Sequence, residues 1–176
     1  MSLSIRCWPR SGAGLLLLLA GCAPNLEAQT YEHEAVLAAP AAADFPVVSD
    51  ALLLSCGTLD CHGQAGRNLR VYGYGGLRLS APDTPAGDPT TDLEYLSSYV
   101  SLVSLEPETL SEVATLQADP NQLSLVRKTR GIEHHKGGQR ARTGDSLDRC
   151  IVLWLTGKFD SAPCEDVVNA PRPNSE

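Results

Sequence analysis

Two cysteines and a histidine lie close together in the stretch Cys56-Gly57-Thr58-Leu59-Asp60-Cys61-His62. Thiols can join in a disulfide, form thioethers or hold a metal ion, and imidazole is a common metal ligand. Two further histidines, His134 and His135, follow one another in a polar loop flanked by glycines. An imidazole in such a loop can reach inward to a metal. The chain therefore carries two separated groups of residues that suit metal chemistry.

The C-x4-C-H pattern of Cys56, Cys61 and His62 resembles the covalent haem-attachment site of c-type cytochromes, whose usual spacing is C-x-x-C-H. In those proteins two thioethers hold the porphyrin and the histidine ligates the iron. Residues five apart on an ideal helix point about 140° away from each other, so residues 57–60 must leave helical geometry. The same looped backbone suits a Cys56–Cys61 disulfide. The spacing leaves haem attachment and a disulfide open, and the histidine directly after Cys61 favours haem.

The length and charge of the chain limit the classes of partner. Its 176 residues allow one domain behind a targeting segment. The formal net charge is −7, and removal of an N-terminal signal would take away Arg6 and Arg10 but no acidic residue. An acidic protein is a poor match for nucleic acid or for an anionic membrane surface. We therefore expect no nucleic-acid partner, whereas basic redox partners are compatible with this charge.

The N-terminal residues 1–21 resemble a bacterial lipoprotein signal peptide. Arg6 and Arg10 form its basic part, residues 15–19 form its apolar core, and Leu19-Ala20-Gly21-Cys22 resembles a lipobox. The apolar run is too short to span a bilayer. Cleavage before Cys22 would leave that cysteine lipid-modified. We expect an exported protein that Cys22 anchors to a bacterial envelope membrane, facing the periplasm or the cell surface.

Four segments are expected along the chain. They are the signal peptide 1–21, an Ala/Pro-rich tether 22–44, a folded domain 45–165 and a polar tail 166–176. The folded domain holds four cysteines: Cys56, Cys61, Cys150 and Cys164. An even number in an exported domain fits bridges or thioethers better than free thiols.

The folded domain is expected to be helical. A first helix begins at Phe45 and Pro46 and runs into Cys56. Thr91-Asp92-Leu93-Glu94 is a capping box that opens a second helix. The buried stripe expected on that helix is Leu93, Leu96, Val100 and Val103. Pro107 and Asp119-Pro120 begin two shorter helices. The inward residues expected on these are Leu110, Val113, Leu116, Leu123 and Val126.

The last expected helix has the clearest pattern. Asp145 caps it and Gly157 ends it. Its inward positions recur at i, i+3, i+4, i+7 and i+8, and are Leu147, Cys150, Ile151, Trp154 and Leu155. A Cys150–Cys164 disulfide would fasten the following segment to this helix. Closing that loop would contribute about 3 kcal/mol on the chain-entropy account.

The region between the first two helices is rich in glycine and arginine. Residues 71–77 fit a hairpin or a Gly-rich loop, because glycine supplies the positive φ that turns need. Arg67, Arg70 and Arg78 are spaced through the region. Each is expected on a solvated face. As a hypothesis, one or two of them pair with haem propionates instead, because guanidinium binds carboxylate bidentately.

The residue inventory restricts the second axial ligand of a haem. Cytochromes c commonly use methionine there, but Met1 is the only methionine and is removed with the signal. His134, His135 and His33 remain. His135 is preferred because it heads the Lys136-Gly137-Gly138 turn, and His134 comes next. Ligation by two histidines fills both axial positions, which favours electron transfer over oxygen or peroxide chemistry.

The order of these features along the chain resembles that of divergent cytochrome c-like lipoproteins of Gram-negative bacteria. The features are the lipobox, the first helix, the Cys-x4-Cys-His-Gly motif, the internal helices, His134-His135-Lys136-Gly137-Gly138 and the final Trp-containing helix. The resemblance implies a mainly α, class I cytochrome c-like domain whose N- and C-terminal helices pack together. It implies one covalent haem c held by Cys56 and Cys61, with His62 as the proximal ligand and His135 as the distal candidate. The implied role is electron transfer with periplasmic or membrane redox proteins, without catalysis.

Two other classes of function remain open. One is a haem-free binding or structural lipoprotein, stabilised by Cys56–Cys61 and Cys150–Cys164 disulfides. The other is an enzyme, either a thiol–disulfide oxidoreductase or a zinc site built from Cys56, Cys61 and His135. Redox catalysis prefers C-x-x-C in a βαβ context, and structural zinc needs four well-spaced ligands kept reduced. Neither requirement is met by the sequence.

Overall fold

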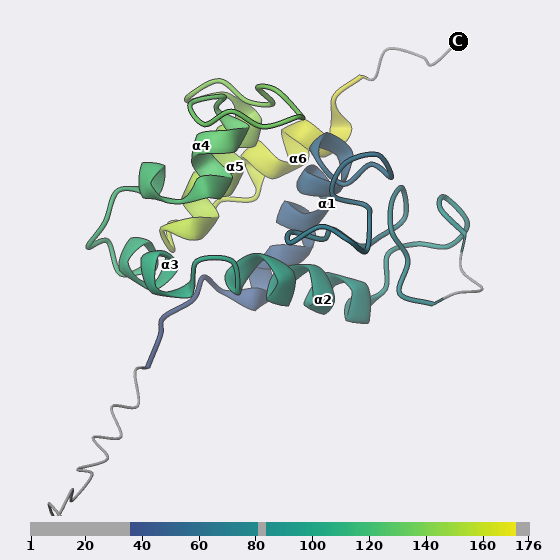
Figure 1. The fold of residues 1–176 in the computed structure, drawn as a ribbon, viewed down its shortest axis with the longest axis horizontal. Coiled ribbons are helices and arrows are strands. Elements are labelled where there is room, and N and C mark those ends of the chain that lie inside the picture. The colour runs from purple at the N-terminus through teal and green to yellow at the C-terminus, as the bar shows by residue number, and fades with distance from the viewer. Residues whose placement is uncertain (1–35, 81–83, 172–176) are drawn as a thin grey trace, which may run out of the picture. The chain divides into compact units, whose positions relative to one another are not determined.

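The computed structural model describes residues 36–80 and 84–171, and the described part is mainly helical (Figure 1). Its α-helices are α1 (Phe45–Ser55), α2 (Asp92–Val103), α3 (Pro107–Ala114), α4 (Ser124–Thr129), α5 (Ser146–Leu155) and α6 (Ala162–Asn169). Two short 3₁₀ helices are η1 (Ala42–Asp44) and η2 (Pro120–Gln122). Within the described ranges there is no named strand, and one isolated bridge joins Tyr72 to Leu77. The expectation of a mainly α fold is confirmed.

The predictions for the signal peptide, the lipidated Cys22 and His33 lie outside the described residues. The same holds for residues 22–35 of the expected tether and for the end of the polar tail from residue 172. None of the described helices is long and apolar enough to cross a membrane.

The core forms where the first helix packs against the last two. α1 contacts both α5 and α6, and these two contact each other. Phe45 of α1 and Trp154 of α5 are fully buried, with ring centroids 5.0 Å apart. The expected Cys150–Cys164 disulfide is present and joins α5 to α6. These contacts fix the direction of α1, which ends at the cysteine motif.

The expected last helix is confirmed in its caps and its buried face. The Asp145 side chain accepts a hydrogen bond from the Asp148 N–H at the start of α5, and Gly157 follows the helix with φ of +65°. All five expected inward residues of this helix are buried: Leu147, Cys150, Ile151, Trp154 and Leu155. Burial of this stripe explains why its period was readable in the sequence.

The expected boundary between the domain and a polar tail at residue 165 is wrong. α6 continues to Asn169, and Val167 and Val168 pack against the core. Pro163 lies in the first turn of α6, where its missing N–H is tolerated, and the disulfide of Cys164 holds the helix on α5. The segment is too short and too polar for its two valines to signal a helix.

The folded part also begins before the expected boundary at Phe45. The Ala38 N–H donates to Ser111 Oγ at 2.9 Å, and the Tyr99 hydroxyl donates to the Pro40 carbonyl at 2.9 Å. Trp154 Nε1 donates to the Ala41 carbonyl, also at 2.9 Å. These contacts use the backbone of an alanine-rich segment, so they leave no apolar pattern in the sequence. Residues 38–41 are docked on the domain and are no tether.

The expected capping box of α2 is present, but the apolar stripe of this helix faces outward and not toward the core. The Thr91 side chain accepts from the Glu94 N–H, and Glu94 accepts from the Thr91 N–H. Leu93, Leu96 and Val100, expected to be buried, are 63%, 53% and 52% exposed. The residues of α2 that are buried instead are Glu94, Ser98, Ser101 and Leu102.

Polar bonds explain this orientation of α2. Ser98 Oγ accepts from the Tyr72 N–H at 2.9 Å and donates to the Tyr72 carbonyl at 3.4 Å. Ser101 Oγ accepts from the Arg70 N–H at 2.8 Å and donates to the Asn68 carbonyl at 3.3 Å. Segment 68–72 thus finds partners for its backbone on the helix, in the way a neighbouring strand would supply them.

Arg78 is neither on a solvated face nor available to a propionate, so both expectations for it are wrong. Its Nε lies 2.7 Å from Glu94 Oε1, and both side chains are buried. The guanidinium also donates to the carbonyls of Asp88 and Pro89. This ion pair holds the Gly-rich region against α2. Residues 71–77 themselves form a Gly-rich loop, in which the Gly73 N–H donates to the Leu77 carbonyl.

The connection from α3 to α4 differs from the expectation at one residue. Leu110 and Val113 of α3 are buried as expected, but Leu116 is 58% exposed and has φ of +60°. Leu116 follows the end of α3, where the chain turns into the left-handed region and carries the side chain outward. Asp119-Pro120 begins η2, and α4 starts only at Ser124; Leu123 and Val126 are buried.

Candidate functional site

The cysteine motif is a compact turn at the end of α1. Cys56 caps the helix, the Cys61 N–H donates to the Thr58 carbonyl at 2.9 Å, and the His62 N–H donates to the Cys56 carbonyl at 3.0 Å. The chain therefore leaves helical geometry directly after Cys56, as the spacing predicts. A Cβ at Gly63 or at Gly76 would collide with the Gly57 carbonyl, so these glycines permit the close packing of the turn.

The two sequence regions singled out for metal chemistry meet at one cavity. A cavity of about 310 Å³ is lined by Cys56, Cys61, His62 and His135. A neighbouring cavity of about 450 Å³ shares Cys56, His62 and His135 and extends to the apolar residues Leu69, Leu105 and Leu125. Volumes of this size suit a small-molecule or cofactor ligand. His134 is exposed and lines neither cavity.

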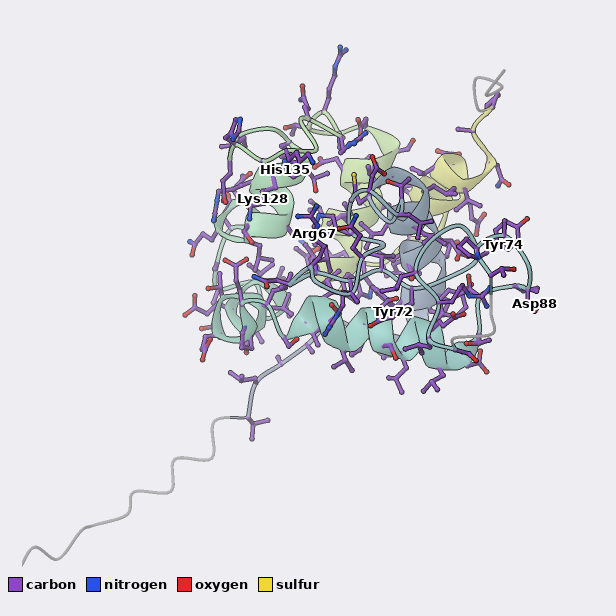
Figure 2. All side chains as sticks on the ribbon, turned by 45° about the vertical axis from the view of Figure 1, so that its right-hand side comes forward. Arg67, Tyr72, Tyr74, Asp88, Lys128 and His135 are labelled. Carbon is purple, nitrogen blue, oxygen red and sulfur yellow. A yellow bond between two sulfur atoms is a disulfide. The ribbon has the colours of Figure 1, made fainter. Side chains whose placement is uncertain are left out.

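The mouth of the cavity is basic, although the whole chain is acidic. Arg67, Lys128, Lys136 and Arg140 line it, together with the single acid Asp60. Figure 2 shows Arg67, Lys128 and His135 on the same side of the domain, coming from three separate segments. Arg67 Nε also donates to the Cys61 carbonyl at 3.1 Å, which ties this cation to the cysteine turn. The mouth can therefore receive an anionic group.

The tautomer of His62 is set by its hydrogen bond. Its Nδ1 lies 3.0 Å from the carbonyl oxygen of buried Leu69. A carbonyl can only accept, so Nδ1 carries the proton and the lone pair is left on Nε2. Metal-ligating histidines are held by this kind of second bond, which orients the ring and increases its basicity. The Val71 N–H donates to the His62 carbonyl at 3.0 Å and fixes the backbone as well.

His135 presents a buried nitrogen that has no partner among the described residues. That atom is its Nδ1, and the ring lies against Gly137, where an added Cβ would collide with the imidazole. Burial lowers the pKa of His135, and the nearby charge of His62 lowers it further. The imidazole is therefore neutral at neutral pH, which is the form that ligates a metal. An unpaired buried nitrogen calls for a ligand or a water.

The thiols of Cys56 and Cys61 are free, so the disulfide considered between them is not present. Burial raises the pKa of Cys56 to about 11. The thiolate is the nucleophile in thiol–disulfide exchange, and catalytic cysteines have lowered pKa values. Cys56 therefore lacks the activation that a thiol–disulfide oxidoreductase needs.

A zinc site of protein ligands is not assembled in the described part of the chain. No three side chains of His, Cys, Asp or Glu come together there in a group that could hold a metal ion. A porphyrin differs in this respect, because it supplies four equatorial nitrogens and asks the protein only for axial ligands. The cavity is lined by two histidines, His62 and His135, which is the number of protein ligands that a porphyrin iron would require.

Arg70, the remaining arginine of the Gly-rich region, does not line the main cavity. Arg70 Nε is buried and has no hydrogen-bond partner within the described ranges. Its side chain lines an adjoining hollow with Arg67, Asn68 and Ser104. Arg67 is thus the one arginine of the expected three that reaches the main cavity.

Several residues of the site were not found from the sequence. Lys128, Lys136 and Arg140 line the cavity mouth, and Leu69 supplies the carbonyl that orients His62. A backbone acceptor leaves no signal in the residue type. Lys128 and Arg140 flank the histidine loop in the sequence, so the basic run around residues 127–142 was the available signal for the mouth.

Comparisons of the chain with protein-family models, with curated protein sequences and with solved structures found no match.

Proposed function

We propose that this domain holds one haem c and carries electrons in the bacterial cell envelope, to which the lipidated Cys22 anchors it. Cys56 and Cys61 are the attachment residues, His62 is the proximal ligand and His135 the distal one. The observation that carries the proposal is the meeting of these four side chains at one cavity, although His135 lies far from the others in the sequence.

The states of the two histidines support this assignment. The Leu69 carbonyl holds the proton of His62 on Nδ1, which leaves Nε2 for iron. His135 has a lowered pKa and a buried ring nitrogen without a partner among the residues that the structure describes. The apolar side chains Leu69, Leu105 and Leu125 line the neighbouring cavity, where they would pack against the porphyrin. The cations at the mouth, Arg67 and Arg140 among them, can pair with the carboxylates of a bound haem.

Haem supplies reversible one-electron exchange at its iron. If His62 and His135 both held the iron, they would leave no site for oxygen or peroxide, and the haem would supply electron transfer. Ligation by two histidines also gives a lower reduction potential than a His/Met pair, because thioether sulfur raises the potential. Donors and acceptors are accordingly redox proteins of the periplasm or the membrane.

The test is an absorbance spectrum of the full chain, expressed together with a cytochrome c maturation system, and a haem stain of the denatured chain. We expect a sharp reduced α-band and a stained band. His62→Ala should abolish the low-spin spectrum. His135→Ala should convert it to a high-spin form while the stain persists. His134→Ala is the matched control, because this neighbouring side chain is exposed and lies outside the cavity. A colourless chain at full yield, or an unchanged spectrum in His62→Ala, would refute the proposal.

The second candidate is a haem-free binding lipoprotein, and the basic mouth of the cavity favours it. Four cations around one opening can hold a small carboxylate or phosphate ligand without any haem. The Cys150–Cys164 disulfide stabilises the fold independently of a cofactor. An intact mass equal to the chain with no haem added, after export with the maturation system, would decide for this candidate.

A further inference from the structure

The outward face of α2 is a continuous apolar strip. Leu93, Leu96 and Val100 are each more than half exposed, and Val103 at the end of the helix is half-buried. Leu79, 41% exposed, lies in the segment beside the helix. In Figure 1, α2 runs along one margin of the described part of the domain. Single exposed leucines are ordinary, whereas an aligned apolar strip on one helix marks an interaction site.

The spacing of the strip matches one specific kind of partner. Positions 93, 96, 100 and 103 follow the alternation of three and four residues that defines the a and d positions of a heptad. A helix with this seam packs best against another helix with the same seam. Within the described residues Leu93, Leu96 and Val100 are left exposed, because the inward side of α2 is formed by polar residues such as Glu94 and Ser98. Val103, at the end of the helix, packs partly against the core.

Charge restricts the partner further. α2 carries two charged residues: Glu94 is buried in the ion pair with Arg78, and Asp92 is exposed at the first residue of the helix. The chain as a whole has a net charge of −7, so two copies repel one another over most of their surfaces. The middle of the outward face of α2 carries no charge, whereas its two ends carry opposite charges. Exposed Asp92 begins the helix, and Arg70 lines a groove near Ser104 at the other end. Two α2 helices packed antiparallel about a two-fold axis would bring Asp92 of each copy toward the end where the other copy holds Arg70, so that opposite charges flank the apolar contact.

A groove beside the seam gives a second copy a place to insert side chains. It has a volume of about 380 Å³ and runs between α2 and the Gly-rich region, with Tyr72, Leu79, Leu96 and Val100 among its walls. In a two-fold interface each copy presents the same projections and the same groove. Side chains of one seam can therefore enter the groove of the other.

We propose that the protein forms a homodimer through the outward faces of α2. The seam is short, since a helix of twelve residues is only about 18 Å long, so the dimer is weak in dilute solution. Confinement to a membrane surface by a lipid anchor raises the effective concentration and favours the dimer. A helix that lies in a membrane interface carries several Lys or Arg residues beside its apolar face, whereas α2 itself has none and Arg70 is the one cation among the residues that line the groove beside it. None of the residues lining the main cavity comes from α2, so the dimer is independent of haem binding.

The test is sedimentation velocity of the purified full chain over a wide concentration range, in the detergent that a lipid anchor requires. We expect a monomer–dimer equilibrium. Leu96→Glu and Val100→Glu should each raise the dimer dissociation constant about tenfold or more, because a charge would be buried in the seam. Leu116→Glu is the matched control, because Leu116 is equally exposed but lies beyond α3. Circular dichroism shows whether each variant keeps its fold.

A second measurement uses cross-linking. Ser97 lies beside the seam on α2, so Ser97→Cys should give a disulfide-linked dimer, whereas Thr115→Cys should not. A chain that stays monomeric at all concentrations, or a dimer that both Glu variants leave unchanged, would refute the proposal. A monomer whose attachment to uncharged lipid vesicles is lost in Leu96→Glu would assign the strip to a membrane surface and also refute it.

Discussion

His62 and His135 show how a single neighbouring atom decides what a histidine can do. The carbonyl oxygen of Leu69 fixes the proton of His62, whereas the Nδ1 of His135 is buried without such a partner in the described part of the chain. His135 owes its position to the absence of a side chain at Gly137, against which its ring rests. The residue type of histidine was readable in the sequence, but these two supports come from a backbone carbonyl and from a missing Cβ.

Gly137→Ala tests whether the missing Cβ at residue 137 holds the His135 ring in place. The new Cβ would collide with the His135 ring and displace it from the cavity. Because burial is the main cause of the lowered pKa, we expect the pKa of His135 to rise toward about 6.5, as NMR titration of the haem-free chain would measure. In the haem-loaded chain the low-spin fraction should fall. Gly75→Ala is the control, since open space surrounds that position. An unchanged pKa in Gly137→Ala would contradict the role given to this glycine.

At the scale of the element, α2 shows the limit of reading a helix from its period. The capping box and the helix itself were predicted correctly from Thr91 and Glu94. The period also identified an apolar stripe, but it could not say whether the stripe meets the same chain. The inward face was decided by Ser98 and Ser101, whose hydroxyls bond a segment far away in the sequence. α5 was predicted in full because its apolar face and its buried face coincide.

Ser98→Ala and Ser101→Ala should each destabilise the fold. Each substitution removes a hydroxyl that both accepts from and donates to the backbone of residues 68–72, and leaves those partly buried groups without these partners. The expected loss in free energy of unfolding is about 1–3 kcal/mol per substitution. Urea unfolding followed by circular dichroism would measure it. Ser97→Ala is the control on the outer side of the same helix, and an equal loss there would contradict this account.

At the scale of the whole molecule, the buried Arg78–Glu94 pair makes stability depend on pH. Burial alone would raise the pKa of Glu94, but the hydrogen bonds from Arg78, Thr91 and Leu79 outweigh it and hold that pKa below its usual range. A carboxylate with a lowered folded-state pKa stabilises the fold above its unfolded-state pKa. The contribution is lost as the pH falls through the lower, folded-state value.

The free energy of unfolding should therefore fall as the pH drops below about 4.3, the ordinary pKa of a glutamate. In Glu94→Gln the protein should be less stable at neutral pH, because Arg78 loses its charged partner, and its acid dependence should be flatter. Glu112→Gln, at an exposed position of α3, should keep the wild-type acid dependence. Chemical unfolding at a series of pH values measures all three. If the free energy of unfolding fell equally steeply at acid pH in the wild type and in Glu94→Gln, the pH dependence could not be assigned to Glu94.

The site as a whole was partly predictable from the sequence. The C-x4-C-H motif required a loop after Cys56, and the structure has that turn. The choice of His135 over His134 came from a turn beside it, and only His135 lines the cavity. The cations Lys128 and Arg140 and the burial of Arg78 could not be predicted, because they depend on which distant segments meet. Long-range contacts of polar groups have no period that a sequence displays.

The docking of residues 38–41 has a mechanical consequence. The bonds of Ala38 to Ser111, of Pro40 to Tyr99 and of Ala41 to Trp154 follow one another along the irregular segment that enters the domain. A pull on the N-terminal end must break them one after another, and it loads α3, α2 and α5 before it reaches α1. The cysteine turn lies at the far end of α1, so these three bonds would have to break before a pulling force from the N-terminal side reached the cavity.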